Sequence, residues 1–286
     1  MLVALAACGA EPKREPPRIA NGVFTPDAYE AHVAALKKRL AKANALSMRI
    51  RIEGPFVIAG NGTTEQLDRY VELVHRVTGE LEADFFAERP KKILDIFLFE
   101  DARSYELTVR ALTGESPTTP YGFYSSTHGG LFMNVATGGG TLVHELVHPY
   151  VEADFPDAPA WLNEGLGSLF EQSGARDGHI VGFTNWRLAG LQQTLADRGV
   201  PTFQALTHLG DNEFYGNGSG THYAQARYLM YYLQERGLLR DFYQRARSAR
   251  AEDPSGYQTL VAVLGEKDMA AFQIHWAAFV SALEFP

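Results

Sequence analysis

The chain has 286 residues, of which 45% are hydrophobic and 12% aromatic, so it can bury the core of one large domain or of two subdomains that share a cleft. Its formal net charge is -8 and no long Lys or Arg run is present, which argues against a nucleic-acid partner because phosphate binding needs a concentrated basic surface. No stretch of 18 or more apolar residues is present, so the sequence predicts no transmembrane helix.

The first residues of the chain resemble a bacterial lipobox. Met1 to Ala7 are all apolar, and Cys8, the only cysteine, follows Leu5-Ala6-Ala7 where a lipoprotein carries its lipidated residue. The proline-rich residues 11–18 suit a semi-extended tether. We therefore expect residues 1–22 to be a signal remnant and tether, the protein to lie in the bacterial cell envelope, and any membrane contact to run through a lipid anchor at Cys8. The alternative is a frayed apolar end on a cytoplasmic protein.

Apolar periodicity predicts the elements of the N-terminal half. Steps of three and four residues indicate amphipathic helices, whereas period-two alternation and short continuous apolar runs indicate strands. On these grounds we expect helices at 27–44, 63–86 and 102–112, and strands at 47–52, 93–99, 122–126 and 131–135.

After Thr141 the sequence reads as helix and loop. Glycine and proline clusters separate helices that we expect at about 141–151, 160–173, 184–197, 221–236, 238–250 and 266–282. Strands followed by helices indicate an α+β fold. We expect a sheet-bearing subdomain at residues 23–151 and a helical subdomain at residues 152–286.

One of these helices carries a metal-binding motif. Residues 144–148 read His-Glu-Leu-Val-His. Side chains four residues apart share one face of a helix, so His144 and His148 can bind a single Zn²⁺, whereas Glu145 is offset and can take a proton from a water molecule at the metal. A purely structural role would leave these ionisable groups unpartnered on an apolar helix, which is costly.

A third metal ligand is expected 16 positions after His148. Glu164 lies in Trp161-Leu162-Asn163-Glu164-Gly165, and Pro156 and Pro159 indicate a turn that folds this second helix back onto the first. Three protein ligands leave a fourth position for water, as catalytic zinc sites require. We expect one zinc ion per chain.

The two motifs together resemble those of the gluzincin superfamily, which includes thermolysin and the aminopeptidase N family, and look closest to bacterial gluzincin-like lipoproteins. The resemblance covers about residues 130–175. It implies a zincin-like fold, with a small mixed sheet and the active-site helix in the N-terminal half and a mainly helical C-terminal half. It also implies that His144, His148 and Glu164 bind zinc and that Glu145 is the general base.

The resemblance extends to Thr221-His222-Tyr223, at the start of a later helix. In the aminopeptidase N family a tyrosine so placed donates to the oxyanion, which makes Tyr223 a catalytic candidate and His222 its competitor. Tyr223 can equally be one more buried aromatic of its helix. Residues 131–134 lack the acid that binds the substrate's amino terminus in that family, so exopeptidase activity is not supported, although a strand at 131–135 could pair with an extended peptide.

These observations predict a zinc metallopeptidase acting on a peptide or protein substrate. Two alternatives remain open. One is a membrane-tethered binding or scaffolding protein that keeps the metal without turnover, and the other is an amide hydrolase acting on a cell-envelope component, because substrate choice depends on the pocket rather than on the metal motif.

Overall fold

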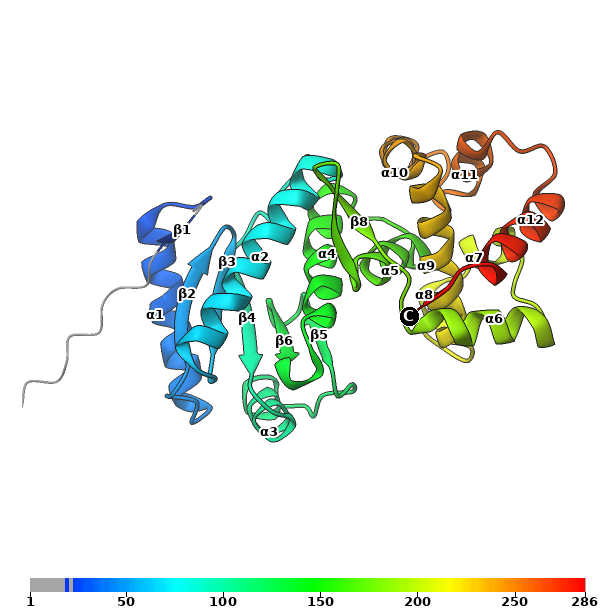
Figure 1. The fold of residues 1–286 in the computed structure, drawn as a ribbon. Coiled ribbons are helices and arrows are strands. Elements are labelled where there is room, and N and C mark those ends of the chain that lie inside the picture. Colours follow the sequence, from blue (N-terminus) through cyan, green and yellow to red (C-terminus); the bar gives the residue numbers. More distant parts are fainter. Residues whose placement is uncertain (1–18, 21–22, 286) are drawn as a thin grey trace, which may run out of the picture.

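The computed structural model describes residues 19–20 and 23–285. The expected lipobox cysteine Cys8 and the expected tether at 11–18 lie outside the described residues. The described part is an α+β structure with a small mixed sheet in its N-terminal half and a mainly helical C-terminal half, as predicted (Figure 1). None of its helices is long and apolar enough to cross a membrane.

The sheet has six strands in the order β1-β2-β3-β4-β6-β5. The pairs β1–β2, β3–β4 and β4–β6 are parallel, whereas β2–β3 and β5–β6 are antiparallel. Strand β3 was not predicted, although its five buried residues form a continuous run like that of β4. The strands are β1 (Ile19–Ala20), β2 (Arg49–Glu53), β3 (Phe56–Gly60), β4 (Leu94–Phe99), β5 (Gly122–Ser125) and β6 (Gly130–Asn134).

Helices cover both faces of this sheet. Alternate strand residues such as Val57 and Phe97 pack under α1 (Pro26–Lys42) and α3 (Ala102–Thr113). Their neighbours, such as Ile58 and Ile96, face α2 (Thr64–Asp84) and α4 (Gly140–Asp154). Because both faces are covered, the central strands β3, β4 and β6 are buried at every position and mostly apolar, with Asp95 and Asn134 as the polar exceptions in β4 and β6.

Side-chain caps fix where the first three helices begin. Thr25, Thr63 and Asp101 each accept a hydrogen bond from a backbone N–H in the first turn of α1, α2 and α3, respectively. Gly114 ends α3 in the left-handed conformation that glycine adopts without strain. These local signals explain why the predicted bounds agree with the structure to within about two residues there.

The C-terminal half is helical except for one hairpin. Strands β7 (Ser173–Arg176) and β8 (His179–Gly182) pair in an antiparallel manner, so the prediction that only helix and loop follow Thr141 was wrong. Gly174, Gly178 and Gly182 dilute the apolar alternation that would have revealed the strands. The helices are α5 (Ala160–Phe170), α6 (Arg187–Asp197), α7 (Phe203–Thr207), α8 (Asp211–Phe214), α9 (Ser219–Glu235), α10 (Leu239–Ser248), α11 (Tyr257–Leu264) and α12 (Met269–Ser281).

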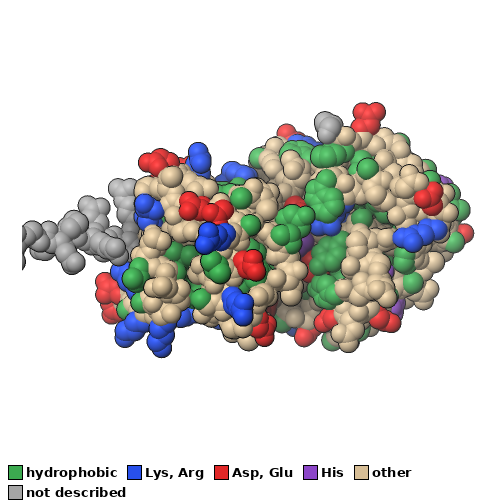
Figure 2. Space-filling view, turned by 90° about the horizontal axis from the view of Figure 1, so that it is seen from below, with side chains coloured by type: hydrophobic (Ala, Val, Ile, Leu, Met, Phe, Trp, Pro, Cys, Tyr) green, Lys and Arg blue, Asp and Glu red, His purple; other side chains and the backbone are tan. Residues whose placement is uncertain are grey.

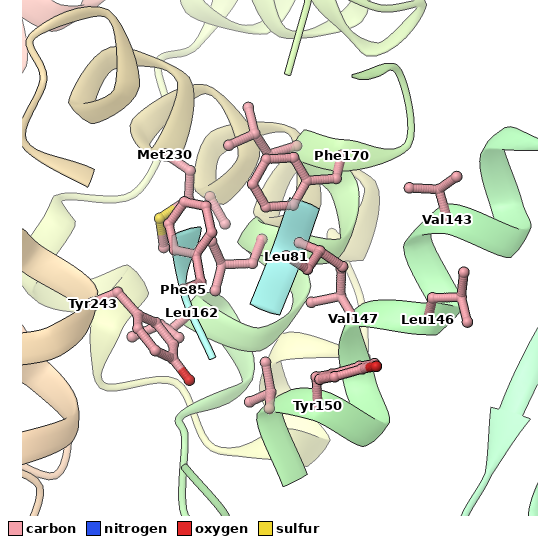
Figure 3. Close-up of a cluster of buried hydrophobic side chains, with 14 of the residues drawn as sticks. Leu81, Phe85, Val143, Leu146, Val147, Tyr150, Leu162, Phe170, Met230 and Tyr243 are labelled. Atoms are coloured by element: carbon pink, nitrogen blue, oxygen red, sulfur yellow. The ribbon is translucent and has the colours of Figure 1, made fainter. Parts of the chain in front are cut away.

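One continuous hydrophobic core joins the two halves. Side chains of α2, α4, α5, α9 and α10 meet in it, among them Leu81, Val147, Leu162, Met230 and Tyr243 (Figure 3). All five are at most 1% exposed. Helices α4 and α5 are therefore held against each other by tight packing on both sides, and this packing fixes the side chains that they share at the site.

A buried carboxylate reinforces this junction. The side chain of Asp154, at the end of α4, is fully buried and accepts hydrogen bonds from the main chain of Ala87 and Glu88, from Tyr243 Oη and from Arg247 Nη1. It thus ties α4 to the loop after α2 and to α10. Hydrogen bonds to a buried charge contribute more than neutral ones.

We expect Asp154→Asn to lower the free energy of unfolding by about 2 kcal/mol, because the amide replaces a charge that several donors share. Urea unfolding monitored by circular dichroism measures the change. The matched control is Asp241→Asn, which removes an exposed ion pair with Arg245 within α10 and should cost less than about 1 kcal/mol. Equal losses in the two variants would contradict the role given to Asp154.

Candidate functional site

A cleft separates the sheet-bearing half from the helical half. Its lining comes from β5, from one face along the length of α4, from α5, and from the beginnings of α6 and α9 with residues just before them. Figure 2 shows it as a hollow between the two halves, with hydrophobic side chains on its walls. His144, Glu145, His148, Glu164 and Tyr223, the five residues singled out from sequence, all line this cleft.

Helix α4 presents the two histidines on one face. Its other faces are buried through Leu142, Leu146 and Tyr150, which leaves His144 and His148 directed at the cleft with about a tenth of each side chain exposed. Pro149 lies inside α4 and lacks the N–H of other helical residues, but the helix continues beyond it to Asp154.

Glu164 reaches the same point from α5. Its Oε2 lies 3.1 Å from Nε2 of His144 and 3.9 Å from Nε2 of His148. Ligands of a tetrahedral zinc ion at 2.0–2.1 Å are about 3.3–3.4 Å apart, so the two measured distances lie on either side of the expected value. The donor set of two imidazoles and one carboxylate is also one that zinc prefers.

Glu145 competes with Glu164 for the role of third ligand. Ligand atoms of His144, Glu145 and His148 lie within 4.8 Å of one another, and Glu145 Oε2 is 3.7 Å from His148 Nε2. The environments of the two acids differ, however. Glu145 Oε2 accepts a hydrogen bond of 2.8 Å from the backbone N–H of Tyr124 in β5, whereas Glu164 Oε2 lies between the two histidines. Glu164 is therefore the better-placed ligand.

The pKa values of the two acids separate their roles further. Burial raises the pKa of Glu145, and the nearby histidines only partly offset this effect. Burial acts in the same direction on Glu164, but His148, His144 and the Tyr215 hydroxyl outweigh it and lower the pKa of Glu164 to about 2. At neutral pH Glu164 is therefore ionised, whereas Glu145 has the stronger affinity for a proton.

The cluster stabilises positive charge. Burial alone would lower the pKa of His144, but the hydrogen bond to Glu164 and the charge of Glu145 outweigh it and raise the pKa to about 9. The negative potential that holds a proton on a buried imidazole also favours a metal cation at the same place. The residues present therefore fit a zinc ion in donor type, spacing and charge.

Two neighbours of the histidines were not singled out from sequence. Nδ1 of His148 donates to Asn163 Oδ1 at 2.9 Å, which leaves Nε2 free to bind a metal. At Gly167 a Cβ atom would lie 3.2 Å from the His144 ring, so a larger residue would crowd this imidazole. Asn163 directly precedes Glu164 and lies one helical turn before Gly167. This closeness to Glu164 in the sequence was the only signal that could have identified the two residues.

Two tyrosines approach the cluster from the helical half. Tyr215, which follows α8, donates from its hydroxyl to Glu164 Oε1 at 2.8 Å and was not predicted. Tyr223, in α9, stacks on His144 with 6.4 Å between ring centroids. Burial and the charge of Glu164 raise the pKa of both phenols, which stay protonated and able to donate. His222 instead donates from Nδ1 to the carbonyl of Phe214 and does not line the cleft.

Strand β5 forms the edge of the sheet beside the cluster. The expectation that residues 131–135 offer a free edge was wrong, because β6 lies between β4 and β5 and is paired on both sides. The free edge belongs to β5, whose Phe123 and Tyr124 line the cleft. The order of two similar strands cannot be read from periodicity, which reports only which face of a strand is buried.

Comparison with known proteins gives one family match. Residues 138–253 match a family described as a protein of unknown function, DUF1570. The matched segment contains both motifs, Tyr215 and Tyr223, but not β5. No curated protein matches the chain.

Proposed function

We propose that this protein is a zinc-dependent peptidase of the gluzincin type with a zincin-like fold. The observation that carries the proposal is the convergence of His144 Nε2, His148 Nε2 and Glu164 Oε2 in a cleft where Glu145 stands beside them. The motif resemblance adds support, because it assigns the same four residues the same roles.

When bound, the zinc ion would act as a Lewis acid towards water and the substrate carbonyl. Glu145 accepts the proton of the attacking water at its carboxylate, and the N–H of Tyr124 holds that carboxylate in place. Tyr223 donates its hydroxyl proton in a hydrogen bond to the carbonyl oxygen as negative charge develops there. Glu145 then delivers the proton to the leaving amine, and Asn163 and Tyr215 orient His148 and Glu164.

A peptide is the favoured substrate because of the β5 edge. An extended chain can add to this edge through main-chain hydrogen bonds, which would place one of its peptide bonds beside Glu145. Hydrolysis of a cell-envelope amide uses the same chemistry and remains the alternative substrate class. A scaffold without turnover is less favoured, since it has no need of a buried carboxylate with a raised pKa.

Metal content tests the site directly. We expect the purified protein to bind about one zinc per chain and both His148→Ala and Glu164→Ala to lose it, since two ligands rarely hold a structural or catalytic zinc. Elemental analysis after dialysis measures the content, and a mixed peptide library read by mass spectrometry measures cleavage. His75→Ala, which changes a histidine outside the cleft, is the control. Wild-type protein without zinc, or zinc retained by both variants, would reject the site.

A further inference from the structure

Arg187 is the exceptional charge in the cleft. It is the first residue of α6, and among the described residues it is the only Lys or Arg that lines the cleft. The acidic groups of the lining are Glu145, Glu152, Glu164 and Glu171. Outside the proposed metal site a substrate carboxylate therefore meets positive charge in the cleft at Arg187, and that contrast can select between substrates.

The guanidinium is held in a fixed position. Its Cζ lies 4.2 Å from the centre of the Trp186 ring and 5.4 Å from that of Tyr223, and its Nε donates to Glu171 Oε2 at 3.4 Å. Asn185 Nδ2 donates to the same oxygen at 3.2 Å. The side chain is only 16% exposed, so its position costs little additional ordering when a ligand binds.

Among the described residues, none forms a hydrogen bond with the outer edge of the guanidinium. In the described part of the chain, hydrogen bonds of the Arg187 side chain involve only Nε, which leaves Nη1 and Nη2 free. These two nitrogens form the fork that binds a carboxylate with two parallel hydrogen bonds. An arginine that served only to join α6 to α5 would be expected to turn this fork, rather than Nε alone, towards Glu171.

The position of Arg187 relates it to the proposed reaction. The Tyr223 ring is a neighbour of both the guanidinium and the proposed metal site, because its centre lies 5.4 Å from Arg187 Cζ and 6.4 Å from the centre of the His144 ring. An extended peptide advances about 3.3 Å per residue, so a substrate cleaved at the cluster reaches Arg187 within a few residues.

We propose that Arg187 is a specificity-determining residue that binds a substrate carboxylate a few residues from the cleaved bond. The substrate class is an acidic peptide. The bound carboxylate belongs either to an Asp or Glu side chain of that peptide or to the peptide's C-terminus. This inference rests on the proposed function, because it assigns the bound carboxylate to a peptide substrate. Carboxylate binding itself can be measured without hydrolysis.

The test measures binding to the zinc-loaded Glu145→Gln protein, in which turnover is suppressed. Three probes are compared by calorimetry: an acetylated and amidated peptide with one Glu, the same peptide with Gln, and the Gln peptide with a free C-terminal carboxylate. Trp186 is 61% exposed, whereas Trp161 and Trp276 are buried, so tryptophan fluorescence reports whether a probe lies beside Arg187.

We expect at least one carboxylate probe to bind about tenfold or more tightly than the neutral probe, because charge-assisted hydrogen bonds contribute more than neutral ones. Preference for the Glu probe identifies an internal acid, and preference for the free-acid probe identifies a C-terminal carboxylate. Adding Arg187→Gln should abolish the preference, and Arg187→Lys should keep part of it because the charge remains without the fork.

Adding Glu171→Gln provides a readout that a merely structural ion pair would not move. Removing the competing carboxylate should strengthen the preference for the charged probe, whereas a structural pair would only lose stability, which thermal melting records. Equal binding of all three probes, no binding of any, or a preference that survives Arg187→Gln would overturn the inference. Hydrolysis by the wild-type protein is assayed separately, so a carboxylate preference without cleavage would reject the proposed function and keep this one.

Discussion

Glu145→Gln is expected to lower kcat by about a thousandfold to ten-thousandfold while the protein keeps its zinc. The amide has nearly the same shape as the carboxylate but cannot accept the proton of the attacking water, and general-base catalysis contributes up to about this factor. Because the proposed ligands are His144, His148 and Glu164 rather than Glu145, metal content should stay near that of the wild type. Initial rates on a cleaved library peptide, together with elemental analysis of the same samples, check both parts.

The matched control for this prediction is Glu80→Gln. Glu80 lies on α2, pairs with Arg76 through an exposed i, i+4 ion pair, and does not line the cleft. Its replacement should leave kcat unchanged and cost little stability. If Glu145→Gln kept wild-type kcat, a different base would be required. If it lost its zinc, Glu145 would instead be a ligand, as its 3.7 Å separation from His148 permits.

The second large effect is expected at the two tyrosines. Tyr223→Phe should lower kcat by about a hundredfold to a thousandfold with little change in zinc affinity, because a donor to the developing oxyanion contributes only in the transition state. Tyr215→Phe should instead weaken zinc binding by about tenfold to a hundredfold, since its hydroxyl orients Glu164. Steady-state kinetics at saturating zinc and competition with a chelator separate the two effects.

Tyr231→Phe is the matched control on helix α9. Tyr231 follows Tyr223 by two helical turns, packs on Tyr228 and Phe279, and lies outside the cleft lining. Neither kcat nor zinc affinity should respond to it. A reversed pattern, in which Tyr215→Phe lost kcat and Tyr223→Phe lost zinc, would exchange the two roles and make the more exposed Tyr215 the oxyanion donor.

Local interactions explain which parts of this protein the sequence alone determined. Helices α1, α2 and α3 follow from apolar spacing and from caps at Thr25, Thr63 and Asp101, which act within a single turn. The pairing of His144 with His148 follows from the helical repeat, because residues four apart must share a face. The α+β character follows from the order of strands and helices along the chain.

Tertiary packing decided the strand order and the side chains that line the cleft, which the sequence patterns could not predict. The order of β5 and β6, and hence which strand has a free edge, depends on pairing between strands that look alike in sequence. Tyr215 contacts Glu164 from a position 51 residues later in the chain, and Arg187 contacts Glu171 from 16 residues later. No sequence periodicity links positions so far apart. Their roles arise because α4, α5, α6 and α9 pack around one cleft, and the side chains that meet there are set by long-range contacts rather than by spacing along the chain.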